Sequence, residues 1–260
     1  MPTYVDEGIV LRRVDYGESD RVLTVLTRHH GKVGVLARGV RKQGSRLAAH
    51  TDLFSHSTLQ LARGRGELEV LTEARRLGAV TNLGDARRSA CAALCAEVAD
   101  TALEAGQPLD EGLFDLVAEA LEACADSARD PRTAVVWFAR RMIDRLGYAP
   151  ELHLCASCGR RLEERAARFS AAGGGLLCPS CGPGDPGGID CPVAAIKVLR
   201  VAASGDAELY ARLRLGPEVL TVLEAVVELE LARHIDRRLR SLEVLRAVLE
   251  GGSGRGEAPR

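Results

Sequence analysis

Two pairs of cysteines constrain this 260-residue chain more than any other feature. Cys155 and Cys158 form one C-x-x-C pair, Cys178 and Cys181 form a second, and 19 residues separate the two pairs. Two intervening residues allow one tight turn to present both sulfurs to a tetrahedral metal, and the separation is typical of four-thiolate zinc sites. Because protein thiolates would fill all four ligand positions, the pattern predicts one structural Zn²⁺ and not a catalytic one.

The remaining cysteines favour other roles. A redox C-x-x-C is usually solitary and lies in a βαβ setting, so two pairs at this spacing favour zinc. Cys191 has no partner beside it and is expected to be a bystander. Cys91, Cys95 and Cys124 lie on apolar, helix-like stretches, where a free cysteine packs as a small hydrophobic residue. In the knuckles, Gly159 and Gly182 follow the second cysteine of each pair, where we expect a positive φ.

The first third of the chain has a strand-like pattern. Short apolar, β-branched runs alternate with glycine-bearing turns, and we expect strands at 8–11, 22–27, 33–37, 57–62 and 68–71 with turns at 29–32 and 63–66. About five strands in so short a segment are typical of an OB-type barrel, which commonly binds oligonucleotides across one face. An SH3-like barrel fits the strand count nearly as well.

The pattern becomes helical after residue 85. The first helix is expected at 86–105, and a second begins after a cap at Asp110. A third runs from Asp130-Pro131 to a stop at Gly147. Two more are expected at 193–203 and at 217–249, the last with a break near 237–241. Aromatic residues are only 3% of the chain, so Leu, Val and Ala must fill the core. The predicted fold is a multi-domain α+β protein: an N-terminal OB-fold β-barrel in 1–80, an α-helical domain in 81–152 and 191–250, an inserted four-cysteine zinc finger in 153–190 and a disordered tail in 251–260.

The distribution of charge points to a polyanionic partner. A formal net charge of −1 conceals +4 in residues 1–80 and −5 in the remainder. The stretch from Arg21 to Thr51, with Arg21 included, contains seven basic residues and no acid. A local field of one sign attracts nucleic acid, and phosphate contacts give affinity without sequence choice. The predicted nucleic-acid-binding residues are Arg28, Lys32, Arg38, Arg41, Lys42 and Arg46. The plainer alternative is a solvated basic surface.

Other signals are weak or missing. Single-strand binders usually add aromatic stacking platforms, and only Tyr4, Tyr16 and Phe54 are available in the barrel. The chain has no phosphate loop of the ATPase kind, no G-x-S-x-G elbow and no complete dinucleotide fingerprint, so we predict no enzyme and no catalytic residues. A site formed by His29, His30, Asp15 and Asp20 is conceivable, but exposed turn residues are the simpler interpretation. Apolar runs are much shorter than the roughly 18 residues of a membrane span, and no signal peptide is recognisable, so we expect a soluble, cytoplasmic protein.

Several motifs in a fixed order resemble one protein family. They are GIVLR at 8–12, YGESDR at 16–21, TRHHGK at 27–32, ARGVRK at 37–42, LGYAPEL at 146–152 and HIDRRLRS at 234–241. Together with the cysteine pairs they resemble the bacterial RecO family of recombination mediators, over residues from about 4 to 248. The stretch at 50–54 departs from that pattern, because it lacks the proline expected before its aromatic residue.

The resemblance implies a function beyond what the residues indicate by themselves. Family members bind single- and double-stranded DNA, anneal complementary strands, work with RecR, contact the acidic tail of single-strand-binding protein and help to load RecA. The positions carried over are the six basic residues above for DNA and the four knuckle cysteines for zinc. The main rival hypothesis is a zinc-ribbon protein–protein adaptor whose barrel does not bind DNA. A metal-dependent hydrolase is disfavoured, because it would need an open coordination position.

Overall fold

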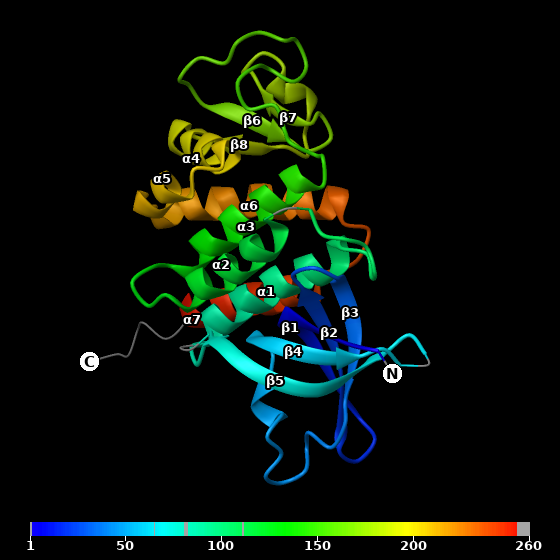
Figure 1. The fold of residues 1–260 in the computed structure, drawn as a ribbon. Coiled ribbons are helices and arrows are strands. Elements are labelled where there is room, and N and C mark those ends of the chain that lie inside the picture. The colour runs from blue at the N-terminus through cyan, green and yellow to red at the C-terminus, as the bar shows by residue number, and fades with distance from the viewer. Residues whose placement is uncertain (1, 65, 81–82, 111, 254–260) are drawn as a thin grey trace, which may run out of the picture. The chain divides into compact units, whose positions relative to one another are not determined.

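The computed structural model describes residues 2–64, 66–80, 83–110 and 112–253, and the chain divides into two compact units. Unit 1 comprises Met1–Pro131 and Leu239–Arg260, and unit 2 comprises Arg132–Arg238. The fold is mixed α+β, with strands dominating the N-terminal part and helices the remainder (Figure 1). Within the described ranges, no helix is long and apolar enough to cross a membrane.

Five strands of unit 1 close into a barrel (Figure 1). They are β1 (Thr3–Tyr16), β2 (Asp20–Thr27), β3 (Gly31–Ala37), β4 (Ser55–Ala62) and β5 (Glu69–Ala79). Their order is β1-β2-β3-β5-β4, and β4 pairs back onto β1. Neighbours are antiparallel except β3 and β5, which run parallel. The predicted number of strands is confirmed, although β1 and β5 extend well beyond the apolar runs that indicated them. The predicted turn at 63–66 includes Arg65, which lies outside the described residues.

Alternation along the strands fills the barrel with aliphatic side chains. Val25, Val35 and Leu61 are completely buried in it. Gly8 lies in β1 at a point where a Cβ would be 2.7 Å from Leu59 Cδ1 and 2.8 Å from Val25 Cγ1. A larger residue at position 8 would therefore collide with the core that closes the barrel.

The segment that leads into β4 shows what replaces the expected proline. Phe54 is buried and adopts a positive φ of 64°, which is uncommon for a residue with a side chain. Its amide donates to the carbonyl of Val10 at 2.9 Å. A short 3-10 helix, η1 (Ala48–His50), precedes it. The chain thus enters β4 through a strained residue that is held by burial and a backbone hydrogen bond.

Three helices belong to unit 1: α1 (Ala86–Ala102), α2 (Leu113–Ala125) and α7 (Arg240–Ser253). Asp85 caps α1 by accepting the amide of Arg88 at 3.0 Å. The predicted cap of the second helix at Asp110 is wrong, because Gly112 occupies the N-cap of α2 with a φ of 77°. Cys91, Cys95 and Cys124 are completely buried on α1 and α2, which confirms that they pack in the core.

The last helix is joined to α1 by a carboxylate. Glu97 of α1 accepts the amides of Arg240 at 3.0 Å and Ser241 at 2.7 Å, and it also accepts the Ser241 hydroxyl. The first turn of α7 is thereby satisfied by a side chain from another helix. The break predicted near 237–241 is present between α6 and α7. The helix α7 continues to Ser253, past the position 251 at which the tail was expected to start. The rest of the predicted tail, 254–260, lies outside the described residues.

Unit 2 combines four helices with a small sheet. The helices are α3 (Pro131–Arg145), α4 (Val193–Ser204), α5 (Ala207–Arg212) and α6 (Pro217–His234), and the strands are β6 (Ala167–Ser170), β7 (Gly175–Leu177) and β8 (Ile189–Cys191). The sheet has the order β7-β6-β8. Gly147 follows α3 with a φ of 86°, as expected for a helix stop. The helices expected to form one domain are therefore divided between the two units.

A buried ion pair joins α3 and α6. Arg140 is completely buried and donates to Glu230 of α6 and to Asp144 of its own helix. Burial raises the pKa of Glu230 to about 7, although the charge of Arg140 acts in the opposite direction. The pair fixes how these two helices pack, since separating either partner would leave a charge in an apolar interior.

Candidate nucleic-acid interface and metal centre

The four predicted zinc ligands converge in unit 2. The sulfurs of Cys155, Cys158, Cys178 and Cys181 all lie within 4.8 Å of one another, and those of Cys158 and Cys178 are 3.9 Å apart. Sulfurs placed at about 2.3 Å from a tetrahedral zinc ion are about 3.8 Å apart. This group of four thiols can therefore hold a metal ion with little adjustment.

Backbone turns after each pair create this geometry. The carbonyl of Cys155 accepts the amide of Gly159, and that of Cys178 accepts the amide of Gly182, both at 2.8 Å. Gly159 has the predicted positive φ, at 72°. The same prediction for Gly182 is wrong: it begins a 3-10 turn, η2 (Gly182–Gly184). A Cβ there would lie 3.1 Å from Cβ of Arg168, so close packing is the reason for a glycine at this position.

The electrostatics of the cluster fit a cation. Burial by itself would raise the pKa of the Cys155 thiol. Backbone amides directed at its sulfur have the larger combined effect, and the pKa is lowered to about 6. The hydrogen bond with Cys178 raises the pKa of Cys181 to about 11. Two thiolates side by side repel each other, so a second cysteine of the group stays protonated unless a positive charge lies between them. A bound metal supplies that charge. Cys191 lies in β8, outside this group, and burial raises its pKa to about 11.

The six predicted nucleic-acid-binding residues do not form one patch. Arg28 lies at the turn between β2 and β3, and Lys32 lies at the start of β3. The other four, Arg38, Arg41, Lys42 and Arg46, follow the end of β3. Arg38 follows Lys32 by six residues along β3, and at about 3.3 Å per residue this separates the two groups by about 20 Å. The structure thus brings four of the six together and places two at the other end of the barrel.

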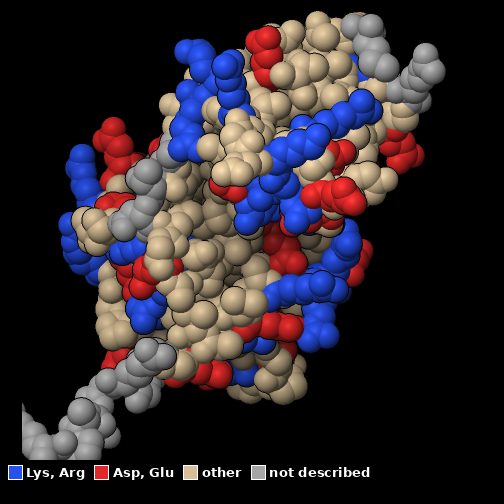
Figure 2. Space-filling model, turned by 90° about the horizontal axis from the view of Figure 1, so that it is seen from below, with Lys and Arg blue, Asp and Glu red and all other residues tan. Residues whose placement is uncertain are grey.

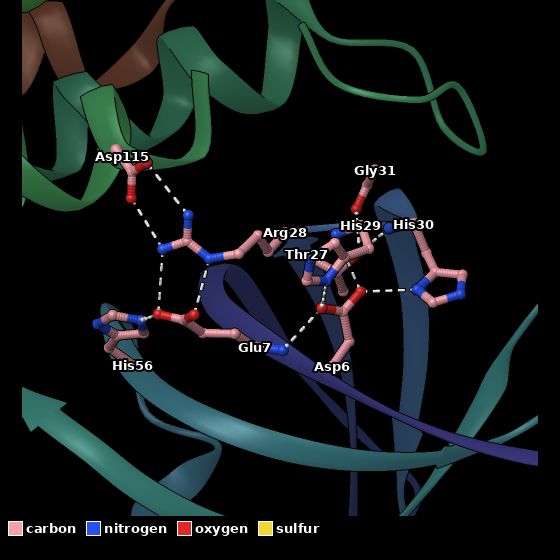
Figure 3. A network of polar contacts seen from close by, with 9 residues as sticks. All are labelled: Asp6, Glu7, Thr27, Arg28, His29, His30, Gly31, His56 and Asp115. Atoms are coloured by element: carbon pink, nitrogen blue, oxygen red, sulfur yellow. Dashed lines mark hydrogen bonds and ion pairs between the residues drawn. The ribbon is translucent and has the colours of Figure 1, made fainter. Parts of the chain in front are cut away.

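Arg28 is held by carboxylates (Figure 3). Its guanidinium donates to Glu7 of β1 at 2.7 Å and to Asp115 of α2 at 2.8 Å. It also lies 4.3 Å from the ring centroid of Phe114. His56 Nε2 lies 2.6 Å from the same Glu7 carboxylate. The hydrogen bonds of Arg28 lower the pKa of both Glu7 and Asp115, so this cation is neutralised where the barrel meets α2.

The neighbouring histidines are occupied in the same way (Figure 3). Asp6 has a completely buried side chain, and its two oxygens lie 2.8 Å from His29 Nδ1 and 2.6 Å from His30 Nδ1. Asp15 and Asp20 lie at the other end of β2. The site that His29, His30, Asp15 and Asp20 could have formed is therefore not assembled.

Lys32 is similarly engaged. Its ammonium group donates to the carbonyl of Asp100 in α1 and lies 3.2 Å from the carboxylate of that residue. Only 13% of the side chain is exposed. Lys32 therefore joins β3 to α1 and has little surface to offer to a ligand.

The four remaining cations lie on a folded loop. We call residues 38–46 the basic loop; successive turns join Lys42 N to Gly39 O at 3.2 Å and Ser45 N to Lys42 O at 3.1 Å. Asp20 fixes its start by accepting the amide of Gly39 at 2.7 Å. That hydrogen bond lowers the pKa of Asp20, and the charges of Arg38 and Lys42 act in the same direction.

The cations of the basic loop differ in their partners. Arg41 lies 3.4 Å from Asp15 and donates to the carbonyl of Gly17 at 3.2 Å. Arg38, Lys42 and Arg46 are exposed, and among the described residues no carboxylate lies within ion-pair distance of them. Viewed from below, the molecule shows Lys and Arg side chains gathered beside an uncharged area, with a few acids among them (Figure 2).

Sequence reasoning missed one cation on this side of the barrel. Arg12 of β1 is 64% exposed, and its Nε lies 3.4 Å from Thr24 Oγ1 on β2. It shares the outward face of β1 with Val14 and Tyr16, since strand side chains alternate. The positions 12, 14 and 16 alternate along the strand and could have indicated that β1 continues with these side chains on one face. The apolar run from which the strand was predicted ended at Leu11.

These features define a class: a two-unit α+β protein in which a small barrel carries exposed cations and a helical unit carries four thiols that could hold a metal ion. Comparison with known proteins agrees with this class and identifies the family. The chain belongs to the RecO family, since residues 1–79 match the family model "Recombination protein O N terminal" and residues 83–243 match "Recombination protein O C terminal".

Relatives named "DNA repair protein RecO" align over nearly the whole chain. The protein from Roseiflexus sp. (strain RS-1) is 36% identical over 243 residues, which cover 93% of this chain and 84% of the relative. That from Symbiobacterium thermophilum is 30% identical over 248 residues, covering 94% and 97%. That from Exiguobacterium sibiricum is 33% identical over 250 residues, covering 95% and 97%. The protein is thus a DNA repair protein of the RecO family.

Proposed function

We propose that this protein binds DNA through the basic loop and acts without catalysing a chemical step. One observation carries the proposal: Arg38, Lys42 and Arg46 are exposed on an ordered loop and, among the described residues, have no carboxylate within ion-pair distance. Cations that are not neutralised within the protein are available to replace the counterions of a phosphate backbone. The membership in a DNA repair family supports the same ligand.

We assign the barrel to the OB class. A closed five-stranded arrangement with the order β1-β2-β3-β5-β4 and a parallel β3–β5 contact supports this assignment over an SH3-like barrel. OB barrels bind oligonucleotides on the face of strands 2 and 3 and on adjacent loops. The basic loop begins where β3 ends, so its cations border that face.

The proposed role is that of a recombination mediator. The protein binds single- and double-stranded DNA, anneals complementary strands, and assists RecA loading together with RecR and the tail of single-strand-binding protein. Annealing follows from charge, since neutralised strands repel each other less when both lie on one basic surface. A cytoplasmic location is part of this proposal.

The contacts described above change the expected roles of two residues. Arg28 is paired with Glu7 and Asp115, and Lys32 is paired with Asp100. We therefore assign to both a role in holding the barrel against its helices. The proposed DNA-binding set is Arg38, Lys42 and Arg46, with Arg41 as a contributor that retains its Asp15 contact.

We also propose that the four cysteines bind one structural zinc ion. The insert has many glycines, and the small core formed around Cys155, Leu177 and Cys178 is built partly from the ligand cysteines themselves. Metal binding would supply folding free energy that this core lacks. Zinc would be held by Cys155, Cys158, Cys178 and Cys181, and no protein ligand position would remain open.

The test is DNA binding measured across a salt series. We expect the triple variant Arg38→Gln, Lys42→Gln and Arg46→Gln to bind a labelled single strand more weakly for every sequence. Its slope of log K against log salt should decrease by about 2, since each phosphate contact on a single strand contributes about 0.7. Fluorescence anisotropy at several salt concentrations measures both quantities.

Matched controls are available on the same chain. Replacing the exposed residues Arg75, Arg160 and Arg161 by Gln removes the same formal charge elsewhere and should leave the slope nearly unchanged. An equal loss in both triple variants would mean that only net charge matters and would refute the basic loop as the site. If the unmodified protein binds no DNA at low salt, the adaptor hypothesis replaces the present one.

A further inference from the structure

The outward face of three barrel strands carries an unusual set of side chains. Val14 of β1 pairs with Val22 of β2, and Val22 pairs with Leu36 of β3. The three therefore form one row across β1, β2 and β3, which lie side by side (Figure 1). In the neighbouring row, Tyr16 pairs with Asp20. We call Val14, Tyr16, Val22 and Leu36 the apolar face.

The barrel core does not require these side chains. Its interior is filled by the alternate residues of the same strands, such as Leu23 and Val35, which are 2% and 0% exposed. Val14 and Tyr16 are 52% and 60% exposed. An antiparallel sheet that faces water on one side usually places polar residues there. Val22 and Leu36 are half-buried beside them, so the row presents Val14 and Tyr16 to solvent, and this exposed apolar surface points to a ligand with apolar surfaces of its own.

Cations border the apolar face at both ends. Arg12, two residues before Val14 on β1, lies at one end, where its Nε is 3.5 Å from Asp100 and 3.4 Å from the Thr24 hydroxyl. Arg38 lies at the other end, one residue beyond the last β2–β3 pair, Arg21 and Ala37. Asp20, the strand partner of Tyr16, has a lowered pKa. The hydrogen bond from the Gly39 amide is the main cause, and the charges of Arg38 and Lys42 act in the same direction.

We propose that the apolar face contacts the unstacked bases of single-stranded DNA, and that it makes the protein distinguish single strands from duplexes. This inference rests on the proposed DNA binding and specifies which face of the nucleic acid is bound. Bases of a single strand expose flat apolar surfaces that stack on aromatic rings and pack on aliphatic groups, while its phosphates reach flanking cations. In a duplex those surfaces are stacked inside the helix, so only the cations remain useful.

Charge complementarity favours this occupant over an apolar protein segment. A hydrophobic peptide would bury the valines and Tyr16 but would leave Arg38 and Lys42, which have no ion pair among the described residues, without counter-charges at the edge of the interface. A single strand satisfies both features at once, because every nucleotide brings one apolar base and one phosphate.

The test compares Tyr16→Ser and Val14→Ser with Val5→Ser on a single strand and on a duplex of equal length. Val5 is a matched control, since it is also an exposed valine of β1, at 62%, but pairs with Gln60 of β4. We expect Tyr16→Ser to weaken single-strand binding about tenfold and Val14→Ser severalfold. Duplex affinity should change less than twofold in either, and Tyr16→Phe should retain the affinity of the unmodified protein.

Three results would overturn the inference: unchanged single-strand affinity in Tyr16→Ser, equal losses for single strand and duplex, or an equal effect of Val5→Ser. Thermal melting of each variant shows whether the fold is intact, and these exposed positions should not alter it. The proposed function survives such results provided that the basic-loop triple variant still loses affinity. If the unmodified protein binds neither form of DNA, the proposed function itself fails.

Discussion

The partners of each arginine decide what that arginine can bind. Arg28 and Arg38 both belong to the acid-free stretch between Arg21 and Thr51, yet one contacts two carboxylates and the other is exposed to solvent. The carboxylates come from Glu7 in β1 and Asp115 in α2, far from Arg28 in the sequence. Local charge density therefore does not predict which of these cations remain available to a ligand.

Replacing Arg28 by Gln should destabilise unit 1. The change removes charge-assisted hydrogen bonds to Glu7 and Asp115 and the contact with the Phe114 ring. We expect a loss of about 1–2 kcal/mol at pH 7, limited by solvent screening because the Asp115 side chain is 51% exposed. Urea denaturation measures this loss. Arg41→Gln, which removes a long surface ion pair with Asp15 and one exposed hydrogen bond to the Gly17 carbonyl, should change stability by less than about 0.5 kcal/mol.

The same variant gives a pH dependence with a defined sign. Arg28 lowers the pKa of Glu7 and Asp115 in the folded protein, so their contribution to stability is complete above an ordinary carboxyl pKa of about 4. It is lost as the pH falls through the lowered folded values. The stability difference between the unmodified protein and Arg28→Gln should therefore shrink below about pH 4. A difference that stays constant from pH 7 to pH 3 would contradict the assignment.

At the scale of elements, one carboxylate connects the two ends of unit 1 in the sequence. Glu97 of α1 accepts the first amides of α7 at Arg240 and Ser241, and a carboxylate at a helix N-terminus also interacts favourably with the helix dipole. The helix that closes the described chain is thereby anchored to the unit that contains the barrel. A pattern within α7 alone does not reveal this connection.

Replacing Glu97 by Ala should loosen the start of α7. We expect a loss of about 1–2 kcal/mol, comparable to the removal of an N-cap, and faster amide hydrogen exchange in the first turns of α7. Glu104→Ala is the control, since Glu104 is an exposed acid just beyond α1 and makes no ion pair or side-chain hydrogen bond within the described ranges. Equal exchange rates in both variants would show that α7 does not depend on Glu97.

At the scale of the whole molecule, the two proposed sites lie in separate compact units. The basic loop and the apolar face belong to Met1–Pro131, and the four cysteines belong to Arg132–Arg238. We therefore expect loss of the metal to destabilise unit 2 while the local geometry of the barrel is retained. The division also means that the two proposals can be tested independently.

Replacing Cys178 and Cys181 by Ser should abolish stoichiometric zinc and lower the melting temperature of the protein. The affinity for single-stranded DNA should change by less than about threefold, because no cysteine of the group lies in unit 1. Metal analysis, calorimetry and anisotropy on one sample measure all three quantities. Cys191→Ser is the control and should retain the metal. Full zinc content in the double serine variant would refute the assigned ligands.

Features that depend on local spacing could be predicted from the amino-acid sequence. Two C-x-x-C pairs predicted the convergence of four thiols, and the alternation and turn residues predicted five strands before a helical region. Helix limits at Pro131 and Gly147 were also predictable, because proline and glycine act through their own backbone. The family could be recognised because its motifs occur in a fixed order along the chain.

Which charges are neutralised and which faces are exposed depends on the three-dimensional fold. Closing the barrel brings Glu7 to Arg28, and packing the helices brings Asp115 and Asp100 to Arg28 and Lys32. The division of the helices between two units and the exposure of Val14 and Tyr16 likewise depend on contacts between distant segments. The physical reason is that electrostatic energy and burial depend on distances in space, whereas motif spacing and backbone preference act between neighbours in the chain.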